Sequence, residues 1–577
     1  MKFSQITSMY AAFIFVFILS ACSQQSNEQP ATMTATWNTF VADYIDDYFS
    51  HHPAEAVNAG KHEYDGQLAD YSPEGIAATI EMFKSYLQEA QDFDTTDLSP
   101  EQLFEREYLI SELEENLFWL EDARWPFKNP SFYQGGLSPD VYISRAYAPL
   151  EERFAALITY LNNLPMAIDQ MQENLSQDSL PETYVQLGLG FFNGLATYFE
   201  NDVPPIFASV ENDSLQQAFS QANAQGIQSA SDAAAWLNSV VTTDDYAIGA
   251  DLFQQMLWKT ERVDMPLEEL RAMGEQDLER NLKALQAACN ELASGKSIEE
   301  CIAQVQTNKP PEGPVAGARR QLSELRQFLI DEDIVTIPGT ETCEVAEAPP
   351  YRRSNIAYIN IPGPYEEGLS STYYIAPPDP TWTEDEQNQY IPGEAPLLYI
   401  SVHEVWPGHF LQFLHSNRSE ILFGQLFVGY AFAEGWAHYT EEMMQEAGLQ
   451  GGDPEMHIGQ LLNALLRNVR YLSAIGLHTG ELTVEQSETM FIEYAYQDPG
   501  NARQQAARGT YDPGYLNYTL GKLMILQLRE DWLSAHPDAD MKAFHNQFLS
   551  YGGPPIPLIR KEMMSKSETS EGGQEAI

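Results

Sequence analysis

Apolar residues recur every three to four positions along most of the chain, which is the period of an amphipathic α-helix. Near the N-terminus this pattern includes Trp37, Phe40 and Tyr44. The sequence Ser-Pro-Glu, which begins at Ser72 and again at Ser99, is typical of a helix start because serine caps the helix and proline fits its first turn. Further helices are predicted at 74–90, 101–122, 150–174, 182–200, 245–260, 266–292, 315–330, 521–533 and 540–549.

After residue 333 the pattern changes to short β-branched and aromatic segments separated by proline and glycine. The segments 334–337, 356–361 and 371–375 predict a small antiparallel sheet just before the helix that contains the site described below. We therefore expect a mainly α fold with one small sheet, built as a single domain over 36–564. Two lobes, 36–332 and 333–564, are the alternative.

The first 21 residues have the pattern of a bacterial lipoprotein signal peptide. Lys2 precedes an apolar run that is too short to span a membrane. Leu-Ser-Ala-Cys at 19–22 matches the lipoprotein cleavage box, so Cys22 is the predicted lipidation site and 22–35 the tether. Ser23, in place of the aspartate that retains lipoproteins in the inner membrane, favours the outer membrane, facing the periplasm. An ordinary cleaved signal peptide is the alternative.

Acidic residues outnumber basic residues by 84 to 31, which gives a net charge of −53. This charge repels nucleic acid and anionic lipid surfaces, so neither is expected as a specific partner. It favours solubility first and attraction of a cationic peptide second. The polar stretch 565–577 predicts a disordered tail. Nothing in the sequence indicates an oligomeric state.

An exported chain folds in an oxidising compartment, where cysteines form disulfides. Cys289 ends one helical pattern and Cys301 begins the next, so a bond between them would join a helical hairpin and leave Cys343 free. Three cysteines allow three single pairings, and the sequence alone does not choose among them.

The strongest candidate chemistry lies in the segment HEVWPGH, where His403 and His409 flank Glu404, and in EGWAHY, where Glu434 follows His409 by 25 residues. Two neutral imidazoles and a carboxylate form a ligand set of catalytic zinc, which keeps one position open for water. A further carboxylate can take a proton from that water. We predict that His403, His409 and Glu434 bind one zinc ion, and that Glu404 is the general base.

The two histidines are six residues apart, which would point them about 120° away from each other on an unbroken helix. Pro407 and Gly408 lie between them, and these residue types interrupt a helical turn most readily. We therefore predict a kinked or bulged turn that brings His409 beside His403. A straight helix with diverging rings would contradict the metal site.

HEVWPGH, EGWAHY and the segment YDPGYLNYTLGK at 511–522 resemble the bacterial family called domain of unknown function 885. This resemblance covers the whole mature chain and implies a zincin-like fold in a lipoprotein. More distantly, the arrangement is similar to helical zinc peptidases of the thimet oligopeptidase and angiotensin-converting type. That similarity implies a gluzincin-type fold and zinc-dependent hydrolysis of peptide bonds in short peptides.

Such a hydrolase also needs donors to the oxyanion that forms on the attacked carbonyl. By analogy with the tyrosines of helical zinc peptidases, Tyr518 is the first candidate, followed by Tyr515 and His478. His438 and Glu441 lie one and two turns after the glutamate ligand on the same helical face, so they are candidates to orient a ligand.

Four arginines, which are scarce in this acidic chain, lie between the metal motif and the tyrosines: Arg467, Arg470, Arg503 and Arg508. One of them, with Arg470 as the candidate, would bind a substrate carboxylate, as in a carboxypeptidase. Salt bridges between helices are the alternative role.

Two other functions fit the same motifs. One is a non-catalytic lipoprotein that binds a metal or a peptide, and the other is a metal-dependent hydrolase of a non-peptide amide such as a cell-wall cross-link. The edge of the predicted sheet is a candidate to hold an extended peptide through main-chain hydrogen bonds, with a purely structural sheet as the alternative.

Overall fold

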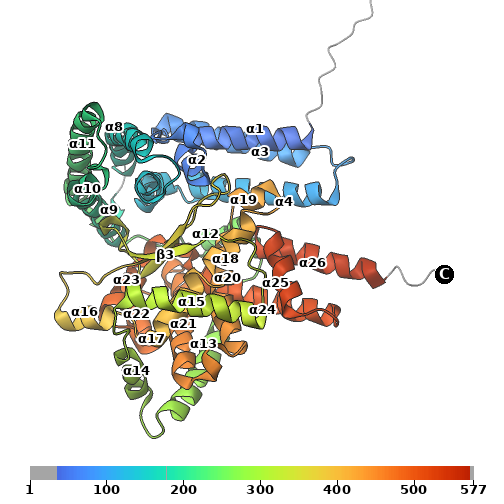
Figure 1. The fold of residues 1–577 in the computed structure, drawn as a ribbon. Coiled ribbons are helices and arrows are strands. Elements are labelled where there is room, and N and C mark those ends of the chain that lie inside the picture. The colour runs from blue at the N-terminus through green and yellow to red at the C-terminus, as the bar shows by residue number, and fades with distance from the viewer. Residues whose placement is uncertain (1–35, 177–178, 572–577) are drawn as a thin grey trace, which may run out of the picture.

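A computed structural model describes residues 36–176 and 179–571, and within them the chain is mainly helical (Figure 1). The predicted signal peptide, Cys22 and the tether up to residue 35 lie outside the described residues. The elements of the N-terminal half are α1 (Trp37–His51), α2 (Pro53–Ala59), α3 (Pro73–Asp92), α4 (Pro100–Leu117), α5 (Trp125–Lys128), α6 (Ser131–Gln134), α7 (Asp140–Ser144), α8 (Leu150–Leu175), β1 (Leu180–Pro181), α9 (Glu182–Asn201), α10 (Val203–Phe207), α11 (Asp213–Leu237), β2 (Thr242–Thr243) and α12 (Ala250–Glu261).

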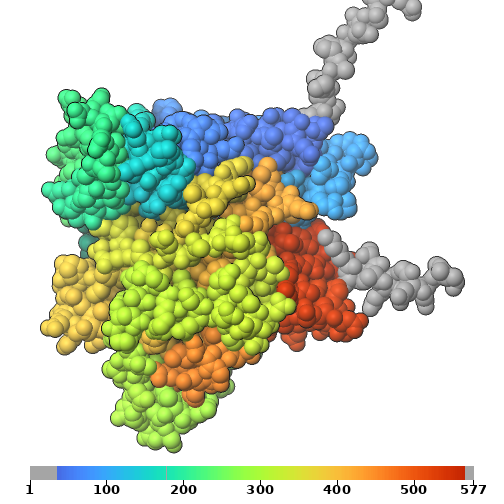
Figure 2. Space-filling view, in the orientation of Figure 1, coloured from blue at the N-terminus to red at the C-terminus, as the bar shows by residue number. Residues whose placement is uncertain are grey.

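Most of the remaining elements lie below helices α1 to α4 in the view shown, where the blue and cyan residues form an upper layer, while α19 lies beside α4 (Figure 1, Figure 2). The remaining elements are α13 (Leu267–Leu292), α14 (Ile298–Thr307), α15 (Pro314–Glu332), β3 (Cys343–Glu347), β4 (Ala357–Asn360), β5 (Ser371–Ile375), α16 (Glu384–Tyr390), α17 (Glu394–Glu404), α18 (His409–Ser416), α19 (Leu422–Leu426), α20 (Tyr430–Glu446), α21 (Pro454–His478), α22 (Val484–Glu493), α23 (Pro499–Tyr511), α24 (Asn517–Ala535), α25 (Met541–Ser550) and α26 (Ile556–Glu571).

Both helix starts that the Ser-Pro-Glu sequences predict are confirmed. The Ser72 hydroxyl accepts a hydrogen bond from the Gly75 amide at 3.1 Å, and Pro73 begins α3. Ser99 and Gln102 form a capping box, in which each side chain accepts a hydrogen bond from the other residue's amide. These bonds satisfy amides that have no partner inside the helix.

Two helical predictions need correction. The helix expected at 101–122 stops being regular after Leu117, and Phe118–Asp122 follows as one π-helical turn. Helix α11 was not predicted, because half of its buried positions are alanine, which marks an apolar face less clearly than larger side chains do.

The predicted sheet exists, but its strands and their directions differ from the prediction. Segment 334–337 is not a strand; the first strand is β3, which runs parallel to β5, while β4 is antiparallel to β5. In the segment 334–337, side chains form hydrogen bonds with the backbone. The Asn546 amide oxygen accepts a hydrogen bond from the Thr336 amide, and His415 Nε2 lies 2.8 Å from the Thr336 carbonyl oxygen. With these partners the segment needs no strand neighbour to satisfy its polar groups.

The apolar clusters cross residue 332, which is the boundary in the alternative division into two lobes. One apolar cluster joins Trp37 of α1 to Leu397 of α17 and Ile525 of α24, and another joins Leu270 of α13 to Leu461 of α21. Helix α26 continues to Glu571, into the stretch 565–577 for which a disordered tail is predicted; residues 572–577 lie outside the described residues.

Helix α21 is the central support of the site. Every residue from Ile458 to His478 is buried, and α13, α17 and α23 pack around it. A helix that is apolar on one side only would face solvent on the other, so this complete burial indicates a core helix. Polar residues placed on α21 are therefore removed from water and must find partners inside the protein.

Helices α20 and α24 approach closely because a glycine of each faces the other. A Cβ atom on Gly435 would lie 2.5 Å from the Gly521 Cα atom, and one on Gly521 would lie 2.1 Å from the Ala431 carbonyl oxygen. The glycines of the EGWAHY and YTLGK motifs thus set the distance between a metal-site helix and the helix that begins with Asn517 and Tyr518.

The predicted disulfide between Cys289 and Cys301 is present and joins the end of α13 to α14, while Cys343 is free. Among the helices of the described residues, none combines the length and the apolar character that crossing a membrane requires.

Candidate metal centre

The interruption predicted between the two histidines separates two helices. Helix α17 ends at Glu404 and α18 begins at His409. The Gly408 amide donates to the Val402 carbonyl at 3.0 Å, and the Pro407 carbonyl accepts from the Trp436 indole of α20 at 2.9 Å. The turn is therefore fixed both to the preceding helix and to the helix that carries the third candidate ligand.

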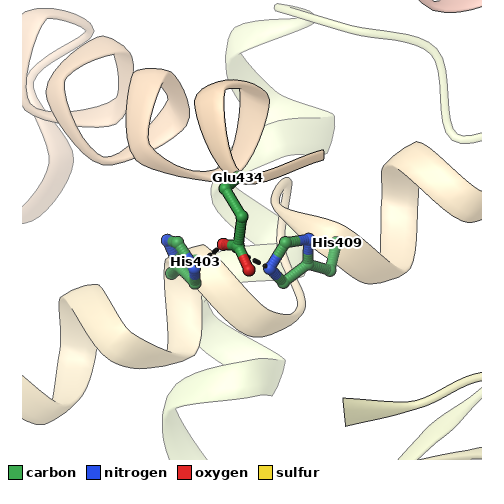
Figure 3. A group of neighbouring side chains, drawn as sticks. All are labelled: His403, His409 and Glu434. Atoms are coloured by element: carbon green, nitrogen blue, oxygen red, sulfur yellow. Dashed lines mark hydrogen bonds and ion pairs between the residues drawn. The ribbon is translucent and has the colours of Figure 1, made fainter. Parts of the chain in front are cut away.

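The turn brings the three predicted ligand side chains together (Figure 3). His403 Nε2 lies 3.1 Å and His409 Nε2 lies 3.2 Å from the same carboxylate oxygen of Glu434, on α20. One ligand atom from each of the three residues lies within 4.8 Å of the others. The predicted convergence is thus confirmed in geometry.

Behind His403 lies a buried ion pair that holds the imidazole ring in place. His403 Nδ1 is 2.8 Å from a Glu441 carboxylate oxygen, and the same oxygen is 2.9 Å from Arg467 Nη2. Arg467 Nη2 also lies 3.2 Å from His403 Nδ1, but the shorter contact is with the carboxylate. Glu441, predicted to orient a ligand, occupies the position for that role.

This arrangement fits a cation between the ligands. A neutral His403 that donates Nδ1–H to Glu441 presents only a lone pair at Nε2. That lone pair faces a carboxylate oxygen of Glu434 at 3.1 Å. Both atoms are hydrogen-bond acceptors, so a proton or a metal ion must lie between them for the contact to be favourable. Two imidazole nitrogens and a carboxylate oxygen are donors that suit zinc.

The electrostatic surroundings favour an ionised carboxylate at Glu434, the candidate ligand, and a raised pKa at Glu404, the candidate base. Burial raises the pKa of Glu434, but His409 and hydrogen bonds from both histidines outweigh it and hold the pKa well below its usual value. Burial raises the pKa of Glu404, and His409 and His403 oppose this rise. Glu404 makes no hydrogen bond or ion pair among the described residues and lines the cavity, so its carboxylate is open to a substrate.

The three ligand residues line a cavity of about 1430 Å³, larger than the 300–1,000 Å³ usual for a small-molecule site. Its wall includes strand β4 and residues of α17, α20, α21 and the segment that leads into α24. The site is therefore reached from a space large enough for a short peptide.

Tyr518, the first candidate for an oxyanion donor, also lies in this wall. Its ring is stacked on that of His403, with ring centroids 5.9 Å apart, and its hydroxyl lies 3.2 Å from Arg508 Nη2. Arg508 donates to this hydroxyl, so the phenol proton remains available for another acceptor.

Two other predicted donors are wrong. Both His478 ring nitrogens are used by the backbone: Nε2 lies 2.8 Å from the Gly509 carbonyl, and Nδ1 faces the Ile248 amide. Tyr515 is buried in the apolar cluster around α21 and does not line the cavity. Both residues hold helices together, because their side chains point into packed interiors.

His438 is fully buried and also does not line the cavity. Its Nδ1 lies 3.7 Å from the Glu441 carboxylate, and burial lowers its pKa to about 3, so the ring is neutral. It therefore contacts the residue that orients His403 and does not reach the metal ligands themselves.

Sequence reasoning missed the role of Arg467 in supporting the site, and it missed Tyr430 and Asp512, which both contact Arg508. Arg467 was named only as one of four arginines. The available signal was its spacing from Asn463 and Arg470, which places the three polar side chains on one face of α21, and all three line the cavity.

The fold and the site together define a mainly helical protein in which two histidines and a glutamate converge at the wall of a large cavity. The chain belongs to the family described as "Bacterial protein of unknown function (DUF885)", whose profile matches residues 53–563.

Two solved structures share this fold. One is described as a candidate lipoprotein of unknown function from Shewanella oneidensis, with a TM-score of 0.72 and 24% identity, covering 92% of this chain and 100% of that one. The other, a candidate lipoprotein from Colwellia psychrerythraea, has a TM-score of 0.77 and 17% identity, covering 93% and 100%. At sequence identities of 24% and 17%, these two structures show that the fold is shared. No curated protein matches the chain.

Proposed function

We propose that this protein is a zinc-dependent peptidase that cleaves short peptides. The observation that carries the proposal is the approach of two imidazole Nε2 atoms to one carboxylate oxygen, at 3.1 and 3.2 Å, beside an open cavity. His403, His409 and Glu434 would hold one zinc ion. Three protein ligands leave a position open, which is the arrangement of a catalytic site.

Bound zinc would polarise a carbonyl group and lower the pKa of a water molecule. Glu404 takes the proton of the attacking water and passes it to the nitrogen of the leaving amine, because its carboxylate lines the cavity beside the ligands and burial raises its pKa. Tyr518 donates its phenol proton as a hydrogen bond to the oxyanion, and Arg508 holds the phenol in place.

A peptide substrate is supported by the sheet. The strand order is β3-β5-β4, so β4 is an edge strand, and Ala357, Tyr358 and Ile359 of this strand line the cavity. An edge strand offers unpaired amide and carbonyl groups, which an extended peptide can pair with. Helices and loops form the remaining walls, and short peptides fit such an enclosed space better than folded proteins.

The proposed location is the bacterial cell envelope, with a lipid anchor on Cys22. The cleavage box at 19–22 supports this proposal, and both structural neighbours are described as candidate lipoproteins. Whether the anchor lies in the outer or the inner membrane is a separate question, for which Ser23 favours the outer membrane.

Metal analysis combined with digestion of a peptide library tests the proposed activity. We expect the purified protein to contain about one zinc ion and to cleave peptides until a chelator removes the metal. Replacing Glu404 with glutamine should preserve the zinc content but lower kcat by at least about 100-fold, since the base is lost. Replacing His409 with alanine should lower both the zinc content and kcat.

The exposed Glu420 is a matched control, and Glu420→Gln should change neither quantity. Full activity of Glu404→Gln would contradict the mechanism. Zinc binding without cleavage of any peptide would instead favour the metal- or peptide-binding lipoprotein, and chelator-sensitive hydrolysis of other amides alone would favour the non-peptide hydrolase.

A further inference from the structure

Three arginines surround Tyr518, and within the described part of the chain two of them have a carboxylate partner and the third has none. The guanidinium carbons of Arg467, Arg470 and Arg508 lie 5.8, 4.7 and 5.6 Å from the centroid of the Tyr518 ring. Arg467 is paired with Glu441, and Arg508 is paired with Asp512, each at 2.9 Å.

Arg470 has no such partner among the described residues. It lies on the central helix α21 and is only 3% exposed. Its one hydrogen bond is from Nε to the neutral Gln505 amide oxygen, at 2.7 Å, which leaves both terminal nitrogens without a protein acceptor. Arg470 lines the cavity of the candidate metal centre, so these nitrogens adjoin the space where a substrate would lie.

An unpaired guanidinium is costly in this position, because burial removes water and the two neighbouring arginines add repulsion. The sequence contains 84 acidic residues, so a carboxylate partner that offsets the cost of burying Arg470 would be easy to supply. The two terminal nitrogens of arginine form a planar pair that matches a carboxylate. An anion that enters the cavity would therefore complete the pairing that the protein leaves open.

We infer that Arg470 binds the C-terminal carboxylate of the substrate, an inference that rests on the proposed function. Both groups lie close to the Tyr518 ring, whose centroid is 4.7 Å from the Arg470 guanidinium carbon and 5.9 Å from the centroid of the His403 ring, so their separation cannot exceed the sum of these two distances. An extended peptide advances about 3.3–3.6 Å per residue. The carboxylate bound by Arg470 therefore belongs to a residue within about three positions of the cleaved bond. It follows that the enzyme would remove one to three residues from the C-terminus of its substrate.

Alanine tri- and tetrapeptides, each as the free acid and as the C-terminal amide, test this inference alongside the library peptides that are cleaved. The wild-type protein should cleave the free acids with a kcat/KM about 10- to 100-fold higher than that of the amides, as expected for loss of one charged hydrogen-bonded pair. Isothermal titration of the same peptides should show the same ratio in affinity.

Arg470→Gln should abolish this ratio, mainly through a higher KM for the free acids, while its zinc content stays at the wild-type level. Arg470→Lys should restore part of the ratio, because lysine keeps the charge but not the paired geometry. The control Arg503→Gln, which replaces an exposed arginine on α23 that is paired with Glu386, should keep the full ratio. Because each variant is compared with itself on two peptides, a general loss of stability does not mimic the result.

Equal cleavage of acids and amides by the wild type, or an unchanged ratio in Arg470→Gln, would overturn the inference. A preference for amidated peptides with an internal aspartate or glutamate would also overturn it, because the carboxylate would then come from a side chain. If no peptide is cleaved, the proposed function fails, and the titrations still decide whether Arg470 selects a free C-terminus.

Discussion

At the residue scale, His403 connects the candidate metal ligands to their supports. One ring nitrogen faces Glu434, and the other faces the carboxylate of Glu441, which Arg467 neutralises. Glu441 is fully buried, and its pKa lies below its usual range because Arg467 and His403 outweigh the effect of burial. A permanently charged carboxylate in this position fixes the tautomer of His403 and makes its free nitrogen a stronger ligand.

Glu441→Gln should therefore weaken zinc binding by about 10- to 100-fold, because the amide does not carry the charge that favours the ligating tautomer. Competition with a chromophoric chelator measures this change in Kd. The control is Glu446→Gln on the same helix, which removes a contact with Arg529 that is remote from the site. An unchanged Kd for Glu441→Gln would show that Glu441 does not support the metal centre.

At the scale of elements, the site depends on the turn that connects α17, which ends at Glu404, to α18, which begins at His409. Pro407 and Gly408 indicate a break, and the structure shows why the second position is glycine. A Cβ atom on Gly408 would lie 1.7 Å from the His403 carbonyl oxygen and 2.5 Å from that of Val402. Both are backbone atoms of a buried helix, so neither can move aside without shifting His403, a candidate metal ligand.

Gly408→Ala should lower the zinc content to below about one tenth of the wild-type value and reduce the stability of the protein by several kcal/mol, as forced overpacking in a core does. Metal analysis and thermal unfolding measure the two effects. Gly190→Ala is the matched control: this glycine lies in α9 with open space where its Cβ would be, so alanine should leave both quantities unchanged or raise stability slightly. Normal zinc content in Gly408→Ala would show that the turn tolerates a side chain.

At the scale of the whole molecule, a buried acid joins three helices that are far apart in the sequence. Glu261, the last residue of α12, accepts hydrogen bonds through one oxygen from the Ala431 amide in the first turn of α20 and from Asn517 at the start of α24. Burial raises the pKa of Glu261 from 4.5 to about 8, although the Ala431 amide lowers it. The helix that carries Glu434 is thus held in place by a side chain that is protonated in the folded protein below about pH 8.

This pKa predicts how stability depends on pH. Between about pH 4.5 and 8 the folded protein retains a proton on Glu261 that the unfolded chain releases, so this residue lowers stability progressively as the pH rises through that window. Glu261→Gln keeps the acceptor oxygen but has no proton to lose, so its stability should fall less steeply than that of the wild type. The difference in slope is at most about 1.4 kcal/mol per pH unit.

Denaturant unfolding of chelator-treated protein at pH 5, 6.5 and 8 would measure the two slopes without a contribution from metal binding. Glu268→Gln, at an exposed position in α13, is the control and should follow the wild type. Parallel curves for Glu261→Gln and the wild type would show that Glu261 ionises normally in the folded protein.

The sequence by itself determined the features that depend on neighbouring residues. Helical periodicity, the caps at Ser72 and Ser99 and the break at Pro407-Gly408 all involve contacts within a few turns of chain. The ligand set was predictable for the same reason, since two of its members lie within seven residues and the third on the next long helix. The pair Cys289–Cys301 is also local, but the sequence left it as one of three possible pairings and the structure decided it.

Only the tertiary structure decided which side chains meet across long separations. It placed β3 parallel to β5 and removed Tyr515 and His478 from the site. Among residues 36–176 and 179–571 it also gave Arg467 a carboxylate partner and Arg470 none. The physical reason is that burial and pairing depend on which distant helices pack together. The pattern of residues along any one helix carries almost no information about that choice.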